Sequence, residues 1–410
     1  MKATERGVRV YERFIARQPI LDEKLKLFGY ELLFRARDDT RAGEDPQATA
    51  QLIVSSTMLF DWETLLDGAS AFINFGAQEI VSGAALLLPK LQTIIEIPPT
   101  LTFDDDLIQG IKNLRLAGYR VALDGFSADG NLERVLRYVN FVKVDFQETQ
   151  ETEQTAIRTA LSRFEAKPIA KKIESWKEFD RARRSGYVYY QGHFFLEPQV
   201  LKRKELAGSE EHCLELLRLV HQKPMDVPRI EEVLKQEPAL MYKLLRFLNS
   251  PLLARPVEVK SVHSAIALLG DDEFRRWASL VAVLTPATEK PSELIRTGLT
   301  RAFFCEALAR AKTRGAMPFE YFLVGLFSVM SALLDRPLGD ITAEIAVNGN
   351  VRDALNGKPN ELRYALDAAL GFEQGKWGAF TEAMERLELD EEKAPECQDE
   401  ANRIVKELQV

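Results

Sequence analysis

Polar residues suited to phosphate or metal chemistry occur in, or at the ends of, seven short apolar runs in the first half of the chain. In order they are Glu31, Asn74, Glu96, Asp124, Lys143, Lys171 and Gln191. Carboxylate and amide oxygens are hard ligands for divalent cations, whereas cationic side chains compensate the charge of phosphates. Lys171 is followed by a second cation, Lys172. The series therefore predicts a metal or phosphate site in which one position carries an unexpected positive charge.

The stretches that separate these runs have helical patterns. They span residues 45–59, 107–117, 151–164 and 176–184, with Asp45 as an N-cap and with Gly118 and Gly186 as helix-ending residues. Continuous apolar strands that alternate with helices are typical of a parallel sheet covered on both faces. The spacing predicts an α/β barrel, with an open sheet as the alternative, and places the site at the C-terminal ends of the strands.

The second half of the chain has a different pattern. After Pro198, strand-like runs give way to successive helices: residues 230–248 show a helical period, and another helix begins at Ser261 and ends at Gly270. We therefore predict an α/β barrel domain over residues 1–204 and an all-α domain over residues 205–410. The junction falls between Pro198 and Ser209.

The composition excludes several classes of protein. With 46% hydrophobic and 28% charged residues the chain is globular, and its net charge of −8 argues against nonspecific binding to nucleic-acid polymers. The three cysteines are too far apart for a disulfide framework or a metal site. The N-terminus lacks the apolar core of a signal peptide, and the apolar stretch 322–334 is too short to cross a bilayer. We expect a cytoplasmic protein that does not bind membranes.

The string GYELLFR at residues 29–35 resembles the signature of EAL domains, which are cyclic di-guanosine monophosphate (cyclic di-GMP) phosphodiesterases and their inactive relatives. Later elements follow in the order of that family: Asn74, Glu96, ALDGF with Asp124, VKVD with Lys143, AKKIE with Glu174, and QGHFFLEP with Gln191. The resemblance implies that Glu31, Asn74, Glu96 and Asp124 match the ligands of the first metal. It also implies that Lys143 lies beside water and phosphate, that Arg35 holds a ligand phosphate, and that Gln191 lies at the floor of the pocket.

The departures from that family concern its chemistry. The family's Asp-Asp pair is here Asp124-Gly125, so the second metal loses a carboxylate, and Lys171 occupies the position of the proposed general base. Pro99 replaces a carboxylate that steadies the site loop, which here reads FSAD at residues 126–129. The changes at Gly125 and Lys171 alone make the centre about three charges more positive, before Pro99 is counted. Because an ammonium accepts no proton from water unless its pKa falls by several units, we expect no catalysis and no metal cofactor.

Two interpretations of the altered site remain open. In one, Lys143, Lys171 and Arg35 compensate the charge of cyclic di-GMP without a metal. In the other, these cations pair with Glu31, Glu96, Asp124 and Glu174, and the barrel mouth binds nothing.

The helical half resembles an HDOD domain, in residues 231–251 (EEVLKQEPALMYKLLRFLNSP) and 261–270 (SVHSAIALLG). HDOD domains are related to HD metal-dependent phosphohydrolases but generally lack their ligands. The histidines are His193, His212, His221 and His263, and none is followed by aspartate. The His-Asp doublet of that chemistry is therefore missing. Residues 319–334 resemble the segment that follows the HDOD core in bacterial EAL–HDOD proteins.

These observations favour a non-catalytic signalling protein that acts by protein–protein interaction through its HDOD domain. An effector role for cyclic di-GMP, of the kind that regulates motility or biofilm, is one form of this function. The alternative is a weak phosphodiesterase that hydrolyses cyclic di-GMP with residual Mg²⁺ at Glu31, Asn74, Glu96 and Asp124. The sequence identifies neither the partner nor the pathway.

Overall fold

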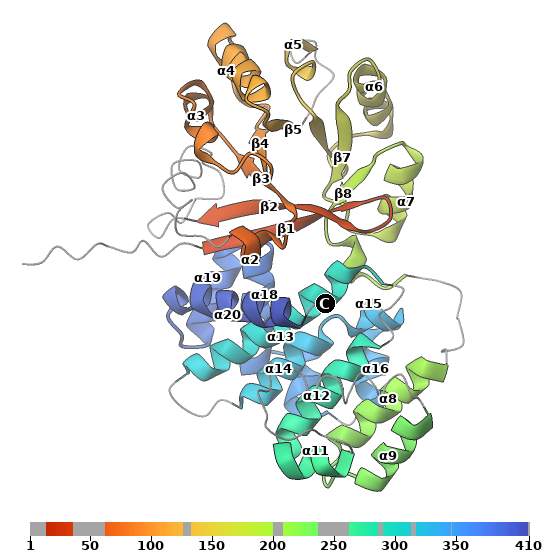
Figure 1. Ribbon diagram of the computed structural model, residues 1–410. Helices are drawn as coiled ribbons and strands as arrows, with labels where there is room; N and C mark the ends of the chain where they lie inside the picture. The colour runs from red at the N-terminus through yellow and green to blue at the C-terminus, as the bar shows by residue number, and fades with distance from the viewer. Residues whose placement is uncertain are drawn as a thin grey trace, which may run out of the picture.

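The computed structural model describes residues 14–35, 62–125, 133–199, 208–236, 262–285, 290–312, 317–345 and 347–408. The predicted helix at 45–59, the loop at 126–129 and most of the HDOD-like segment 231–251 lie outside these residues. Figure 1 shows a barrel followed by a helical domain that lies against strands β1 and β2.

The barrel is closed by eight strands in chain order. They are β1 (Phe14–Asp22), β2 (Leu27–Arg35), β3 (Ser70–Asn74), β4 (Thr93–Ile97), β5 (Arg120–Asp124), β6 (Phe141–Asp145), β7 (Lys167–Lys171) and β8 (Tyr189–Gln191). Neighbours from β2 to β8 are parallel, whereas β1 is antiparallel to both β2 and β8. The predicted α/β barrel is confirmed and the open sheet is excluded.

The sequence predicted seven strands, and the strand that it missed is β1. Its sequence, FIARQPILD, places Arg17 and Gln18 in the middle of the run. It therefore lacks the continuous apolar character that a strand buried on both faces shows.

Helices and turns connect the strands. They are α2 (Trp62–Leu66), α3 (Ala77–Val81), η1 (Ala84–Leu87), α4 (Asp105–Leu116), α5 (Glu133–Leu136), α6 (Glu151–Leu161), α7 (Trp176–Arg184) and η2 (Phe194–Leu196). The Asp104 side chain caps α4 by accepting a hydrogen bond from the backbone of Leu107. A capping box between Ser175 and Glu178 begins α7. The predicted helices at 107–117, 151–164 and 176–184 correspond to α4, α6 and α7.

The barrel interior has an apolar floor near the N-terminal ends of the parallel strands. This floor consists of six buried residues from six strands: Ile20, Phe72, Ile94, Ala122, Phe141 and Ile169. Phe28 and Tyr189 pack against them from β2 and β8. Because side chains alternate along a strand, residues two positions away from floor residues also point into the barrel. Once the floor residues are known, the sequence therefore determines which side chains form the layer above them.

The second domain contains helices throughout its described residues. They are α8 (Gly208–His221), α9 (Val227–Gln236), α11 (Val262–Leu269), α12 (Asp271–Leu284), α13 (Ser292–Ala311), α14 (Pro318–Phe327), α15 (Met330–Leu334), α16 (Leu338–Glu344), α17 (Gly349–Leu355), α18 (Glu361–Glu373), α19 (Trp377–Arg386), η5 (Glu391–Lys393) and α20 (Ala394–Glu407). The long helix α13 is buried along most of its length. Within the described part of the chain, no helix combines the length and apolar character needed to cross a membrane.

The helical domain packs on β1 and β2 (Figure 1). The Phe14 ring of β1 lies 5.8 Å from the Phe380 ring of α19, centroid to centroid. Arg17 donates to the Asn402 side chain of α20 at 3.0 Å. The Tyr30 hydroxyl of β2 donates to Glu293 of α13 at 2.9 Å. Both apolar and polar contacts therefore join the two domains.

Candidate functional site

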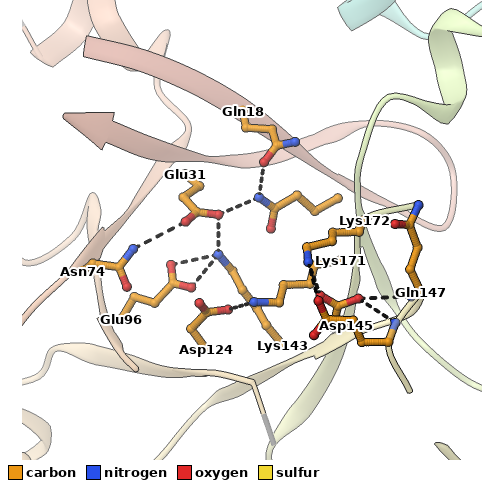
Figure 2. A network of polar contacts seen from close by, with 12 residues as sticks. Gln18, Glu31, Asn74, Glu96, Asp124, Lys143, Asp145, Gln147, Lys171 and Lys172 are labelled. Atoms are coloured by element: carbon orange, nitrogen blue, oxygen red, sulfur yellow. Dashed lines mark hydrogen bonds and ion pairs between the residues drawn. The ribbon is translucent and has the colours of Figure 1, made fainter. Parts of the chain in front are cut away.

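Eight polar side chains form a layer above the apolar floor, and most of them are labelled in Figure 2. Six lie two positions after a floor-level residue of their own parallel strand: Asn74, Glu96, Asp124, Lys143, Lys171 and Gln191. Glu31 joins them from β2. Gln18 of the antiparallel strand β1 lies two positions before its floor residue. We call these eight residues the polar layer. Strand alternation thus brings together seven predicted site residues and adds Gln18.

Lys143 lies at the centre of the polar layer and is fully buried. Its Nζ lies 2.8 Å from Glu31 Oε2 and 2.6 Å from Glu96 Oε1. The same Nζ is 5.2 Å from the centroid of the Phe72 ring in the floor below. Lys143 therefore bridges two buried carboxylates and is sealed from beneath by an aromatic ring.

Amide groups complete the surroundings of Glu31. Gln191 Nε2 donates to Glu31 Oε2 at 2.6 Å and to Gln18 Oε1 at 2.6 Å. Asn74 Nδ2 lies 3.4 Å from Glu31 Oε1. Both oxygens of Glu31 thus accept hydrogen bonds, from side chains of β3, β6 and β8 (Figure 2).

The protonation of this buried trio follows from its charges. Although burial alone raises the pKa of Glu31, the Lys143 charge and hydrogen bonds from Lys143 and Gln191 hold it below its ordinary value. For Glu96, burial outweighs Lys143 and raises the pKa well above the ordinary value. Burial alone lowers the pKa of Lys143, but the nearby carboxylates raise it above the ordinary value. The Lys143 charge therefore favours the ionised form of Glu31, whereas burial favours a proton on Glu96.

The two adjacent lysines of the sequence have different partners. Lys171 Nζ lies 2.6 Å from Asp124 Oδ1, with both side chains about one-fifth exposed. Lys172 adopts a positive φ of 61°, and its Nζ lies 2.6 Å from Asp145 Oδ2 and 3.2 Å from Glu148 Oε1. The turn after β7 therefore directs one lysine toward the barrel mouth and the other toward its rim (Figure 2).

Two departures from the EAL pattern are neighbours in space. Gly125 has a φ of +98°, a conformation that side-chain-bearing residues rarely adopt. A Cβ atom at this position would lie 3.2 Å from Cγ of Pro99. A second aspartate after Asp124 would therefore be strained by its own backbone and crowded by Pro99.

Two predicted site residues are not part of the polar layer as described. Glu174 lies beyond the end of β7, and its Oε2 is 3.8 Å from His193 Nδ1. The polar interaction with His193 holds the pKa of Glu174 below its ordinary value. Of the carboxylates expected to pair with Lys143, Lys171 and Arg35, Glu31 and Glu96 contact Lys143 and Asp124 contacts Lys171, whereas Glu174 lies near His193. The Arg35 backbone belongs to β2, and its side chain lies outside the described part.

The donor set does not fit a metal ion in this arrangement. Within the described residues, no group of three or more histidine, cysteine, aspartate or glutamate side chains is placed to hold one. Glu31, Glu96 and Asp124 instead contact ammonium groups, and the Asn74 amide nitrogen faces Glu31. Lysine ammonium groups occupy the positions beside these oxygens that a divalent cation would require.

Comparison with known proteins agrees with this architecture. The model of the HDOD domain matches residues 208–336. An uncharacterized protein of Bacillus subtilis, YuxH, is 32% identical over 95% of this chain and 97% of its own length. A Vibrio cholerae protein named cyclic di-GMP phosphodiesterase CdgJ is 32% identical over 90% of this chain and 86% of its own length.

The solved structures that resemble this chain include an EAL domain protein from Listeria monocytogenes. It is 19% identical, covers 45% of this chain and 87% of its own, and has a TM-score of 0.36. The length and identity of the match to YuxH and CdgJ establish kinship over both domains. The chain belongs to the family of two-domain proteins in which an EAL-type barrel precedes an HDOD domain.

Proposed function

We propose that this chain is a non-catalytic signalling protein whose helical domain binds a protein partner. The observation that supports this proposal most directly is the pairing of Lys143 with Glu31 and Glu96 and of Lys171 with Asp124. Each carboxylate that would serve metal-assisted hydrolysis already contacts a cation of the chain itself.

The charge of the polar layer supports this proposal. Hydrolysis of a phosphodiester by two divalent ions requires several carboxylates for the metals and a base for the attacking water. Here three carboxylates face two ammonium groups, which leaves a formal charge of −1 before any proton is counted. With a proton on Glu96 the layer is neutral, so a divalent ion gains little attraction there.

The position of the general base supports it further. By resemblance this position is Lys171, whose Nζ lies 2.6 Å from Asp124. An ammonium held by a carboxylate has no free lone pair with which to accept a proton from water. In this function Lys171 pairs with Asp124 across the barrel mouth and takes no part in catalysis.

An effector that binds cyclic di-GMP without hydrolysing it would have to break an existing ion pair of the polar layer. The dinucleotide phosphates would have to compete with Asp124 for Lys171, because Lys143 is sealed beneath Glu31 and Glu96. We therefore favour an adaptor that holds no dinucleotide over an effector. The second candidate function is a weak cyclic di-GMP phosphodiesterase, which the name of the Vibrio cholerae relative favours.

Calorimetric titration of the full chain with cyclic di-GMP, with and without Mg²⁺, separates these functions when the products are analysed by chromatography. We expect no heat and no product. Heat without product would establish an effector and refute the adaptor. Product that disappears in Glu31→Ala, but not in the rim variant Glu148→Gln, would refute the non-catalytic proposal altogether.

A further inference from the structure

A basic groove lies at the end of the barrel opposite the polar layer. It has a volume of about 790 Å³ and surrounds the starts of β5 to β8. Its lining contains the cations Arg115, Arg120, Arg137, Arg163 and Lys167. We call this region the basal groove. The EAL-type site lies at the other end of the strands, so the basal groove is a separate feature.

The charge of the basal groove is opposite to that of the chain. Among the described residues, five cations and one carboxylate, Glu165, line it, which gives +4 in a protein of net charge −8. Arg120 donates to the Ser70 hydroxyl at 2.8 Å and to the Leu91 carbonyl at 3.0 Å, both uncharged acceptors. Burial lowers the pKa of Arg120, as expected where, among the described residues, only uncharged acceptors contact the guanidinium.

Helix ends account for only part of this charge. Helices α4, α5 and α6 end near the groove, and cations are favourable at helix C-termini. Arg115 fits this explanation, because it lies in the last turn of α4 and donates to the Tyr119 carbonyl at 3.0 Å. Arg120 and Lys167 do not, because each is the first residue of a strand. Their positive charges call for another explanation.

Aromatic rings form one wall of the basal groove. Phe28 and Tyr189 are stacked with centroids 4.0 Å apart, and both are only partly buried. Lys167 Nζ lies 6.0 Å from the Tyr189 ring. Aromatic faces stack on nucleobases, and guanidinium groups bind phosphates through paired hydrogen bonds. The groove volume is also within the range of about 300–1,000 Å³ typical of small-molecule sites.

We propose that the basal groove binds a nucleotide that carries two or more phosphate groups. The phosphates lie against Arg120, Arg137 and Lys167, and the base lies against the Phe28–Tyr189 wall. This site is independent of the polar layer and of the function proposed for it.

Titration of the full chain with ATP, GTP and inorganic tripolyphosphate, in about 150 mM salt without divalent ions, tests the proposal. We expect Arg120→Gln/Lys167→Gln to weaken nucleotide binding at least tenfold. The control Arg134→Gln/Arg183→Gln removes the same charge from exposed ion pairs outside the groove and should leave the affinity unchanged. Tyr189→Leu should weaken the binding of the nucleotides about tenfold and the binding of tripolyphosphate less than twofold.

Several outcomes would overturn the proposal. These are no nucleotide binding at millimolar concentration, equal losses in the groove and control variants, or loss of binding in the polar-layer variant Lys171→Gln. A poly-glutamate peptide that binds more tightly than the nucleotides would instead identify a docking groove for acidic proteins. Circular dichroism and thermal unfolding of each variant ensure that a loss of binding is not a loss of fold.

Discussion

Replacement of Lys143 by methionine removes a charge from the centre of the barrel and leaves an unbranched side chain in its place. The ammonium lies 2.8 Å from Glu31 and 2.6 Å from Glu96, and all three side chains are buried. The variant therefore leaves two buried carboxyl groups without the cation that compensates them.

The magnitude follows from the cost of breaking a buried ion pair. Removal of one partner leaves an uncompensated buried charge and typically costs about 3–5 kcal/mol. Burial favours a proton on Glu96, which lowers the part of the cost due to that residue, but Lys143 itself holds the pKa of Glu31 below its ordinary value. We therefore expect the barrel to lose about 3–5 kcal/mol in its free energy of unfolding, a large part of the usual ~5–15 kcal/mol.

Hydrogen exchange measured by mass spectrometry isolates the barrel from the helical domain. Peptides that cover β2, β4 and β6 should exchange about 150- to 5,000-fold faster in Lys143→Met. Lys172→Met is a matched control, because it makes the same substitution at an ion pair with a half-exposed lysine in the same barrel. Its cost should be at most about 1 kcal/mol.

A neutral rescue variant sharpens the test. In Lys143→Met/Glu31→Gln/Glu96→Gln no buried charge remains, so most of the lost protection should return. If Lys143→Met exchanges no faster than Lys172→Met, the carboxyl groups do not depend on Lys143. That result would refute the assignment of the polar layer as a set of mutually compensating charges.

Three further predictions concern other parts of the chain. Gly125→Asp should lower the free energy of unfolding by about 1–2 kcal/mol in urea titration because of its positive φ, and Pro99→Ala should restore only the part that is due to crowding. Burial and a neighbouring arginine lower the pKa of His221 to about 3. Since the unfolded chain then takes up a proton that the folded chain does not, stability should fall by about 2 kcal/mol between pH 7 and pH 5, and His221→Gln should abolish this loss. Finally, Tyr30→Phe should cost about 1–3 kcal/mol in thermal unfolding, since Glu293 loses a buried hydrogen-bond donor; an unchanged melting temperature would show that this bond does not stabilise the domain contact.

Strand periodicity explains why much of the site could be predicted from sequence. A residue two positions after a floor residue must enter the barrel, and five polar residues of the series satisfy this rule, while Gln191 follows Tyr189, which packs against the floor. Glu174 follows the last residue of β7 by three positions, so no alternation fixes its direction, and it pairs with His193 instead. The position of Glu174 outside the polar layer therefore reflects the end of the regular strand.

Gln18 was missed because β1 runs antiparallel to its neighbours. Its inward polar residue precedes the floor residue Ile20, so a search for polar residues at strand ends passes over it. The remaining signal is that two polar residues, Arg17 and Gln18, stand between apolar residues in the run FIARQPILD. The contact between Tyr30 and Glu293 joins residues 263 positions apart, and no local pattern indicates such a pair.

Strand β2 connects the two domains through consecutive residues. Glu31 faces Lys143 inside the barrel, while Tyr30 bonds to Glu293 of α13 in the helical domain. A ligand that draws Glu31 away from Lys143 and a protein that draws Glu293 away from Tyr30 would thus act on adjacent peptide units of one strand. If either event changes the affinity for the other, thermodynamic reciprocity requires the reverse effect to be equal. Under this coupling, a partner bound to the helical domain changes the affinity of the barrel mouth for its ligand. A ligand bound at the mouth changes the affinity for the partner by the same factor.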